Sequence, residues 1–248
     1  MRLARSPMGE RACYKGDGMK SQAYRAILLD VDDTLLDFAR CSQGALAATC
    51  ASLELPYDSR VYAWFRQIDA ELWAAQKRGR ISVEEVLNLR AERLLERLGS
   101  GLRGIAFRRG FQEYLAREAE RTPHALETVH WLSGDYSLYA ASNGILAMQR
   151  SRLELAGLLG ELRGVFVSDD IGYEKPDPRF FRACLERSGA DASSTLMVGD
   201  SLEADMRGAA GCGIDTCWYN PLGLPDGIGC CYMIADLTQL GEILLRER

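Results

Sequence analysis

Histidine is nearly absent from this chain of 248 residues, which contains only His124 and His130. Neither has a spacing to cysteine that is typical of a zinc site. The eight cysteines include no Cys-x-x-Cys pair, and Cys41, Cys50 and Cys184 lie within helical patterns. We therefore expect reduced thiols, as in a cytoplasmic protein, and neither a disulfide framework nor a zinc centre.

An excess of basic charge and a long apolar segment are also missing. The formal net charge is -5, from 30 basic and 35 acidic residues, which argues against a nucleic-acid polymer as partner. No apolar run approaches the ~20 residues that span a bilayer, and the N-terminus lacks the apolar stretch of a secretion signal. We expect a cytoplasmic protein without a membrane partner, in which residues 1–18 form a loose extension.

Four short apolar runs each end in a polar residue. Their lack of alternation is typical of strands buried on both faces, and they are residues 26–30, 137–142, 165–168 and 195–200. Helical patterns separate the last three runs. This order predicts an α/β fold with a Rossmann-like three-layer core, in which helices cover both faces of a parallel sheet.

The stretch 38–121 contains no convincing strand. Apolar residues recur at three- and four-residue spacing from Val61 to Leu72, which predicts a helix with one buried stripe. The next helix begins with a capping box at Ser82. We expect a helical domain at 38–121, inserted into an α/β core domain formed by residues 19–37 and 122–248.

The core is expected to continue with a helix that has Pro123 at its first position. Further along, the patterns predict a helix at 202–210, a strand at 215–219, an edge strand at 231–234 and a closing helix at 237–245.

Carboxylates end the first and fourth predicted strands. Because parallel sheets bind ligands at the carboxyl ends of their strands, these side chains are expected to meet. Asp30 and Asp32 can project into one site, where one attacks phosphorus and the other handles the proton of the leaving group. Asp200 suits Mg²⁺, and Asp205 lies in the first turns of the following helix.

The other two strands are followed by groups that can hold a phosphate. Ser142 and Asn143 offer a hydroxyl and an amide, and Lys175 would offset charge on a transferring phosphoryl group. Each motif alone also has a structural explanation, such as a solvated acidic loop, an Asn-Gly turn or a surface lysine. Separate structural roles of this kind do not explain why all four motifs occur in this order, each at the end of a predicted strand.

The four motifs resemble those of the haloacid dehalogenase (HAD) superfamily: Asp-x-Asp-x-Thr, a strand-ending Ser or Thr, a Lys and an acidic Gly-Asp motif. The resemblance implies that Asp30 is the nucleophile and forms an aspartyl-phosphate. It implies that Asp32 protonates the leaving oxygen and then activates water. The implied ligands and supporting residues are Thr34, Ser142, Asn143 and Lys175 for the phosphoryl group, Asp30, the Asp32 carbonyl and Asp200 for Mg²⁺, and Asp205 to position that cluster.

Asp32 also separates branches of this superfamily. Members that cleave carbon–halogen bonds lack this second Asp, since a halide leaving group needs no proton. The helical insert resembles a C1-type cap, which closes over the site and chooses the substrate. The resemblance to the pyrimidine 5′-nucleotidase branch lies in the segments 142–144, 149–153, 168–176, 198–205 and 213–221, and in 72–73 and 79–82 of the insert. It implies a nucleoside monophosphate as substrate for a monomer or homodimer.

Three other functions stay open at this point. They are a phosphatase for another small phosphomonoester such as a sugar phosphate or phosphoglycolate, a phosphomutase, and a catalytically silent binding domain. Within the cap, Trp73 can stack on a base, but we favour a packed cap residue. The basic run 77–80 can contact phosphate, but we favour a solvated helix face.

Overall fold

Six parallel strands form one sheet in the computed structural model, which describes residues 24–246. The strand order is β3-β2-β1-β4-β5-β6. The bounds are β1 Ala26–Leu29, β2 Ser137–Ser142, β3 Gly164–Val167, β4 Thr195–Gly199, β5 Asp215–Tyr219 and β6 Tyr232–Ile234. Strand β1 pairs with β2 on one side and β4 on the other. The Asp30-x-Asp32-x-Thr34 motif that follows β1 therefore begins in the middle of the sheet. The predicted α/β class and the predicted edge strand are confirmed.

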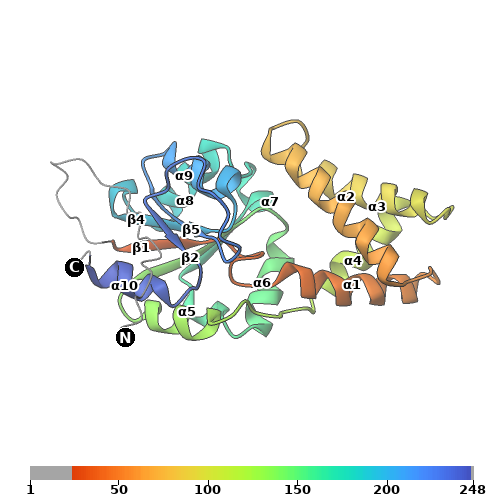
Figure 1. Cartoon of the computed structure of the whole chain (residues 1–248), viewed down its shortest axis with the longest axis horizontal. Coiled ribbons are helices and arrows are strands. Elements are labelled where there is room, and N and C mark those ends of the chain that lie inside the picture. Colours follow the sequence, from red (N-terminus) through yellow and green to blue (C-terminus); the bar gives the residue numbers. More distant parts are fainter. Residues whose placement is uncertain (1–23, 247–248) are drawn as a thin grey trace, which may run out of the picture.

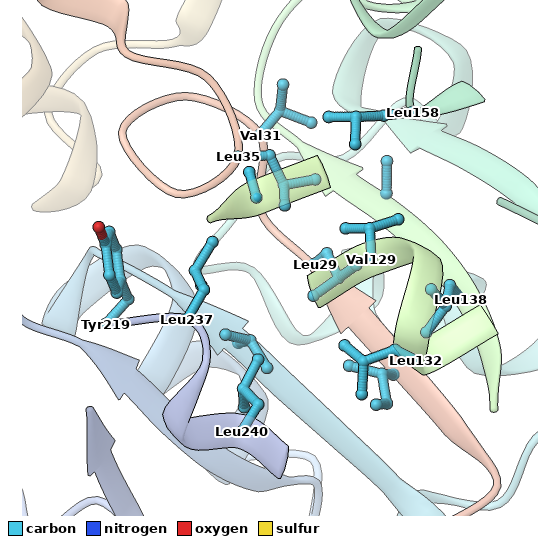
Figure 2. Close-up of a cluster of buried hydrophobic side chains, with 14 of the residues drawn as sticks. Leu29, Val31, Leu35, Val129, Leu132, Leu138, Leu158, Tyr219, Leu237 and Leu240 are labelled. Atoms are coloured by element: carbon cyan, nitrogen blue, oxygen red, sulfur yellow. The ribbon is translucent and has the colours of Figure 1, made fainter. Parts of the chain in front are cut away.

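Helices cover both faces of this sheet (Figure 1). Their bounds are α5 Ala125–Ser133, α6 Leu146–Leu155, α7 Ser168–Ile171, α8 Pro178–Ser188, α9 Gly208–Ala210 and α10 Gln239–Arg246, with short 3₁₀ turns at Leu159–Glu161 and Ala192–Ser194. Side chains from α5, α6 and α10 pack with Ile27 and Leu29 of β1, and Figure 2 shows part of this layer. Leu28 faces the opposite layer, which α8 and α9 cover. Both faces of β1 are thus buried, as its unbroken apolar run predicted.

Four helices follow β1 and form a separate body beside the sheet (Figure 1). They are α1 Phe38–Ser52, α2 Ser59–Lys77, α3 Val83–Arg97 and α4 Gly104–Leu115. Their apolar stripes share one core, in which Phe65 and Phe111 lie at a ring-centroid distance of 5.1 Å. The capping box predicted at Ser82 is present and begins α3. The domain boundaries at 37/38 and 121/122 stay predictions.

Two predicted helices differ in detail. The helix expected from Pro123 begins at Ala125, because Thr122 donates from its backbone N–H to Leu35 and from its hydroxyl to Thr34. These bonds hold the chain in a turn, and His124 adopts φ 61° before the helix starts. The segment Leu202–Arg207 is a π-helix that α9 continues. Its wide turn starts with a bond from the Met206 N–H to the Ser201 carbonyl.

Seven cysteines lie in the described part of the chain, and all are free thiols there. Among residues 24–246, no helix combines the length and the apolar character needed to cross a bilayer. The extension expected at 1–18 lies outside the described residues.

Candidate active site

Lys175 joins two carboxylates at the carboxyl end of the sheet. Its Nζ donates to Asp30 Oδ1 and to Asp205 Oδ1, both at 2.6 Å, and to the carbonyl of Ala141 at 2.8 Å. All three polar side chains are buried. A buried cation is stable only with such partners, so the lysine is fixed between the two acids.

Asp205 reaches this position because Gly199 has no side chain. A Cβ on Gly199 would lie 2.4 Å from Asp205 Oδ2. That oxygen instead accepts a hydrogen bond from the N–H of Ser201 at 3.0 Å. With Oδ1 bonded to Lys175, both oxygens of Asp205 are engaged, which fits a positioning role.

Asp200 differs from its neighbours. Within residues 24–246, no hydrogen bond or ion pair reaches its carboxylate, although its backbone carbonyl accepts from the indole of Trp218. Burial, followed by the nearby charges of Asp30 and Asp205, raises the pKa of Asp200 well above its usual range. Burial likewise raises the pKa of Asp30 to about 7, against the opposing effect of Lys175. The site thus concentrates negative charge that its own cation does not balance.

This acid cluster fits a hard cation. Carboxylate oxygens of Asp30, Asp200 and Asp205 lie within 4.8 Å of one another. Oxygen ligands suit Mg²⁺, which keeps several waters and needs few carboxylates. Because Asp200 lacks a protein partner, its carboxylate is the one best suited to hold the metal, whereas both oxygens of Asp205 are engaged by Lys175 and Ser201.

Thr34 and Asn143 support the acids and the lysine. The Thr34 hydroxyl is fully buried and donates to Asp30 Oδ2 at 3.2 Å. The Asn143 side chain exchanges two 2.8 Å hydrogen bonds with the backbone of Lys175. Both residues therefore fix groups of the site, and their predicted phosphate contacts stay predictions. Ser142 and Asn143 line the cavity that begins at Asp30.

Asp33 turns the chain from β1 toward α1. It adopts φ 62°, a left-handed conformation that Asp tolerates better than most residues. Its carboxylate accepts from the N–H of Phe38 at the start of α1, at 3.0 Å. The turn leaves Asp32 and Asp33 at the surface of the cavity.

Two residues that the sequence analysis did not single out bind Asp32. Gln149 Nε2 donates to Asp32 Oδ2 at 2.8 Å and to the Ser142 hydroxyl at 2.9 Å. Arg152 Nη1 lies 2.6 Å from Asp32 Oδ1. The segment 149–153 had been noted only as a family resemblance, because no strand-end rule points to residues inside a helix.

Helix α2 closes the other side of a cavity of about 350 Å³, which is at the small end of the range for small-molecule sites. The residues of α2 that line it are Arg66, Asp69, Ala70, Trp73, Ala74, Gln76 and Lys77. Trp73 is half-buried, packs against the core of the helical body and also lines the cavity. Lys77 is half-buried there too, whereas Arg78 and Arg80 are exposed. The solvated face predicted for this run fits Arg78 and Arg80, and Lys77 in addition lines the cavity.

The helical body also contacts the loop that carries the lysine. Gln76 Nε2 donates to Glu174 Oε1 and to the Lys175 carbonyl, each at 3.0 Å. Glu174 Oε2 accepts from the N–H of Val83 at 2.8 Å. The start of α3 and the end of α2 are thus tied to the core beside Lys175.

A family model described as haloacid dehalogenase-like hydrolase matches residues 24–213. Among curated proteins, the chain is 34% identical over 224 residues to the HAD-hydrolase YfnB of Bacillus subtilis, covering 89% of this chain and 95% of YfnB. It is 36% identical over 201 residues to the pyrimidine 5′-nucleotidase PynA of Streptococcus pneumoniae, covering 80% and 84%.

A further relative is the pyrimidine 5′-nucleotidase YjjG of Escherichia coli, 27% identical over 224 residues, with 89% of this chain and 98% of YjjG covered. Among solved structures, magnesium-bound YfnB superposes with a TM-score of 0.84 at 33% identity, over 90% of this chain and 99% of YfnB. The magnesium-bound YfnB structure reveals movement between its domains.

Proposed function

The chain belongs to the haloacid dehalogenase-like hydrolase family, and we propose that it hydrolyses the phosphate ester of pyrimidine nucleoside 5′-monophosphates. The observation that carries the chemistry is the meeting of Asp30, Lys175 and Asp200 at the centre of the sheet edge. The substrate class rests on the relatives named pyrimidine 5′-nucleotidase.

Asp30 is the nucleophile of this proposal. One carboxylate oxygen attacks phosphorus, the bond from phosphorus to the ester oxygen breaks, and an aspartyl-phosphate forms. Thr34 donates a hydrogen bond to Oδ2 of Asp30, and Lys175 donates one to Oδ1. Such contacts restrict the carboxylate to one orientation, which favours in-line attack.

Charge balance is the main requirement of this step, because an anionic nucleophile meets an anionic ester. Lys175 supplies one positive charge beside Asp30. Asp30, Asp200 and the backbone carbonyl of Asp32 would hold Mg²⁺, which supplies further positive charge when bound. The unpaired, half-buried carboxylate of Asp200 supports this assignment.

Asp32 handles the protons. It gives a proton to the leaving nucleoside oxygen in the first half-reaction. It then takes one from the water that attacks the aspartyl-phosphate, which releases phosphate and restores Asp30. Gln149 links Asp32 to Ser142, because its Nε2 donates to both side chains. The hydroxyl of Ser142 donates to a phosphate oxygen in this proposal.

The helical body serves as the cap. Its α2 covers the cavity with one aromatic ring, Trp73, and with the cation of Lys77. An aromatic face can stack on a pyrimidine base, and a closed cap keeps bulk water from the aspartyl-phosphate.

The first experiment is phosphate release from a panel of nucleoside monophosphates and sugar phosphates, with Mg²⁺ and with EDTA. We expect release that depends on Mg²⁺ and is fastest for UMP, dUMP or dTMP. Release from sugar phosphates alone would keep the chemistry and contradict the substrate. Absence of release from the whole panel would contradict the proposed hydrolysis.

Trp73→Ala and Trp73→Phe address base recognition in the same panel. If the ring stacks on the base, the alanine variant loses about tenfold or more in kcat/KM for UMP, and the phenylalanine variant recovers part of it. Ribose 5-phosphate, which has no base, is the matched substrate and should show little difference between the variants.

A further inference from the structure

Arg152 is completely buried in the second turn of α6, between Asp32 and the carbonyl of Glu118. Its Nη1 lies 2.6 Å from Asp32 Oδ1, while Gln149, one turn earlier, donates to Asp32 Oδ2 at 2.8 Å. Arg152 Nη1 also donates to Gln149 Oε1 at 3.0 Å. Both oxygens of Asp32 are thus held by one helix, and each keeps a further lone pair for a reacting proton.

The same arginine contacts the segment 116–121, which returns the chain from α4 of the cap to the core. Arg152 Nε donates to the carbonyl of Glu118 at 3.2 Å, and the neighbouring Ser151 hydroxyl donates to the carbonyl of Ala116 at 2.8 Å. The return segment in turn pairs with the outgoing chain, since the Asp37 N–H donates to the Glu120 carbonyl at 2.8 Å. One guanidinium therefore touches both Asp32 and the connection on which the cap is mounted.

Burial makes this contact specific. A buried guanidinium is costly unless an anion and hydrogen-bond acceptors surround it. Among the described residues, Asp32 is the carboxylate in ion-pair contact with Arg152, and the buried Nη2 atom has no hydrogen-bond partner. Displacing Asp32 would leave the cation without its anion, so the present orientation of Asp32 is strongly preferred.

From this arrangement we infer that Arg152 is the positioning residue of Asp32 and ties the orientation of that carboxylate to the return segment of the cap. The inference rests on the proposed function, in which Asp32 protonates the leaving oxygen. Arg152 does not line the cavity, so it acts through Asp32 and not on the substrate.

The test compares two leaving groups. A nucleoside oxygen needs a proton as it departs, whereas p-nitrophenolate is stable without one. In Arg152→Met, we expect kcat/KM for UMP to fall about 10²-fold, as misplaced catalytic groups typically cause. This constant reports the steps up to departure of the leaving group, before Asp32 activates water. The loss of kcat/KM for p-nitrophenyl phosphate should be at least tenfold smaller. Asp32→Asn should show the same preference for the good leaving group.

Arg121→Met is the matched control. Arg121 also joins the return segment to the end of α6, by donating to the carbonyl of Ala156 at 2.8 Å, but it does not contact Asp32. The Arg121→Met variant should leave the ratio of kcat/KM for UMP to kcat/KM for p-nitrophenyl phosphate unchanged. Gln149→Met buries no unpaired charge. It should show the same preference for p-nitrophenyl phosphate over UMP, to a smaller extent, and so it tests the inference even if Arg152→Met folds poorly. Arg152→Lys should restore part of the lost kcat/KM for UMP.

Equal losses on both substrates in Arg152→Met and Gln149→Met, or no loss in either, would overturn the inference while leaving the proposed hydrolysis intact. A wild-type protein that hydrolyses neither substrate would instead overturn the proposed function, and the inference with it.

Discussion

The ammonium of Lys175 lies 2.6 Å from Oδ1 of Asp30, at the end of the strand in the middle of the sheet. The two residues are 145 positions apart in the chain. This ion pair is buried and shared with Asp205, so it serves both the stability of the core and the charge balance that the proposed attack on phosphorus requires.

Removal of Lys175 should therefore destabilise the fold. Lys175→Met leaves Asp30 and Asp205 buried without their cation, which typically costs about 3–5 kcal/mol in the free energy of unfolding. Urea unfolding in metal-free buffer measures this loss. Lys77→Met, which removes a half-buried lysine from the other side of the cavity, should change stability by less than about 0.5 kcal/mol. A similar small change in both variants would contradict the prediction.

Asp30→Asn should abolish turnover while the protein stays folded. The amide keeps the shape of the side chain, and Lys175 keeps its contacts with Asp205 and the Ala141 carbonyl. Without a carboxylate no aspartyl-phosphate forms, so we expect kcat to fall by about 10³-fold or more. Phosphate release with UMP and Mg²⁺ measures activity, and circular dichroism checks the fold. Substantial activity in the folded variant would exclude Asp30 as the nucleophile.

Mg²⁺ should stabilise the protein more strongly as pH rises through about 7. Burial raises the pKa of Asp30 from its ordinary value of 3.8 to about 7, and that of Asp200 well above the same value. Between the ordinary pKa of 3.8 and the raised pKa of about 7, the metal-free folded protein holds protons that the unfolded chain has released. The stability of the metal-free protein therefore falls as pH increases through this range. Metal binding needs the deprotonated carboxylates.

The measurement is the shift of the unfolding temperature on addition of Mg²⁺, which should be larger at about pH 8 than at about pH 6. Asp200→Asn removes the carboxylate that lacks a protein partner, and it should lose most of the shift at both pH values. A pH-independent shift, or a full shift in Asp200→Asn, would argue against this metal site.

The buried ion pair of Arg90 and Asp69 should couple stability within the cap. Their atoms lie 2.7 Å apart, and the guanidinium also covers the rings of Phe65 and Phe111 at 5.3 and 4.7 Å. Arg90→Met leaves Asp69 buried and unpaired, with an expected loss of about 3–5 kcal/mol in the free energy of unfolding.

The double variant Arg90→Met/Asp69→Leu removes both charges and should recover most of that stability, because no unpaired ion remains. Chemical denaturation of the two single variants and the double variant completes the cycle. Losses that simply add would mean that the pair makes no coupled contribution.

Much of the core could be predicted because its signals are local. A strand buried on both faces must be apolar throughout, which is why the runs that end at Asp30, Ser142 and Asp200 were recognisable without any structure. The edge at which parallel strands end then brings their polar residues together. Capping works in the same way, since Ser82 and Glu85 are only three residues apart.

Other features depend on contacts between distant segments, which no period in the sequence encodes. Arg152 lies 120 positions from Asp32, and Gln76 lies 98 positions from Glu174. The start of α5 at Ala125 is set by bonds from Thr122 to the chain 88 positions earlier.

The amino-acid sequence by itself determined the α/β class, the strand-end acids and the helical insert, because burial and helical period act over a few neighbouring residues. Only the tertiary structure decided which helix residues hold Asp32, that Lys77 faces the cavity, and that Asn143 binds the backbone of Lys175. Those outcomes follow from how the cap and the sheet pack against each other, and packing selects partners by shape and charge across the whole fold.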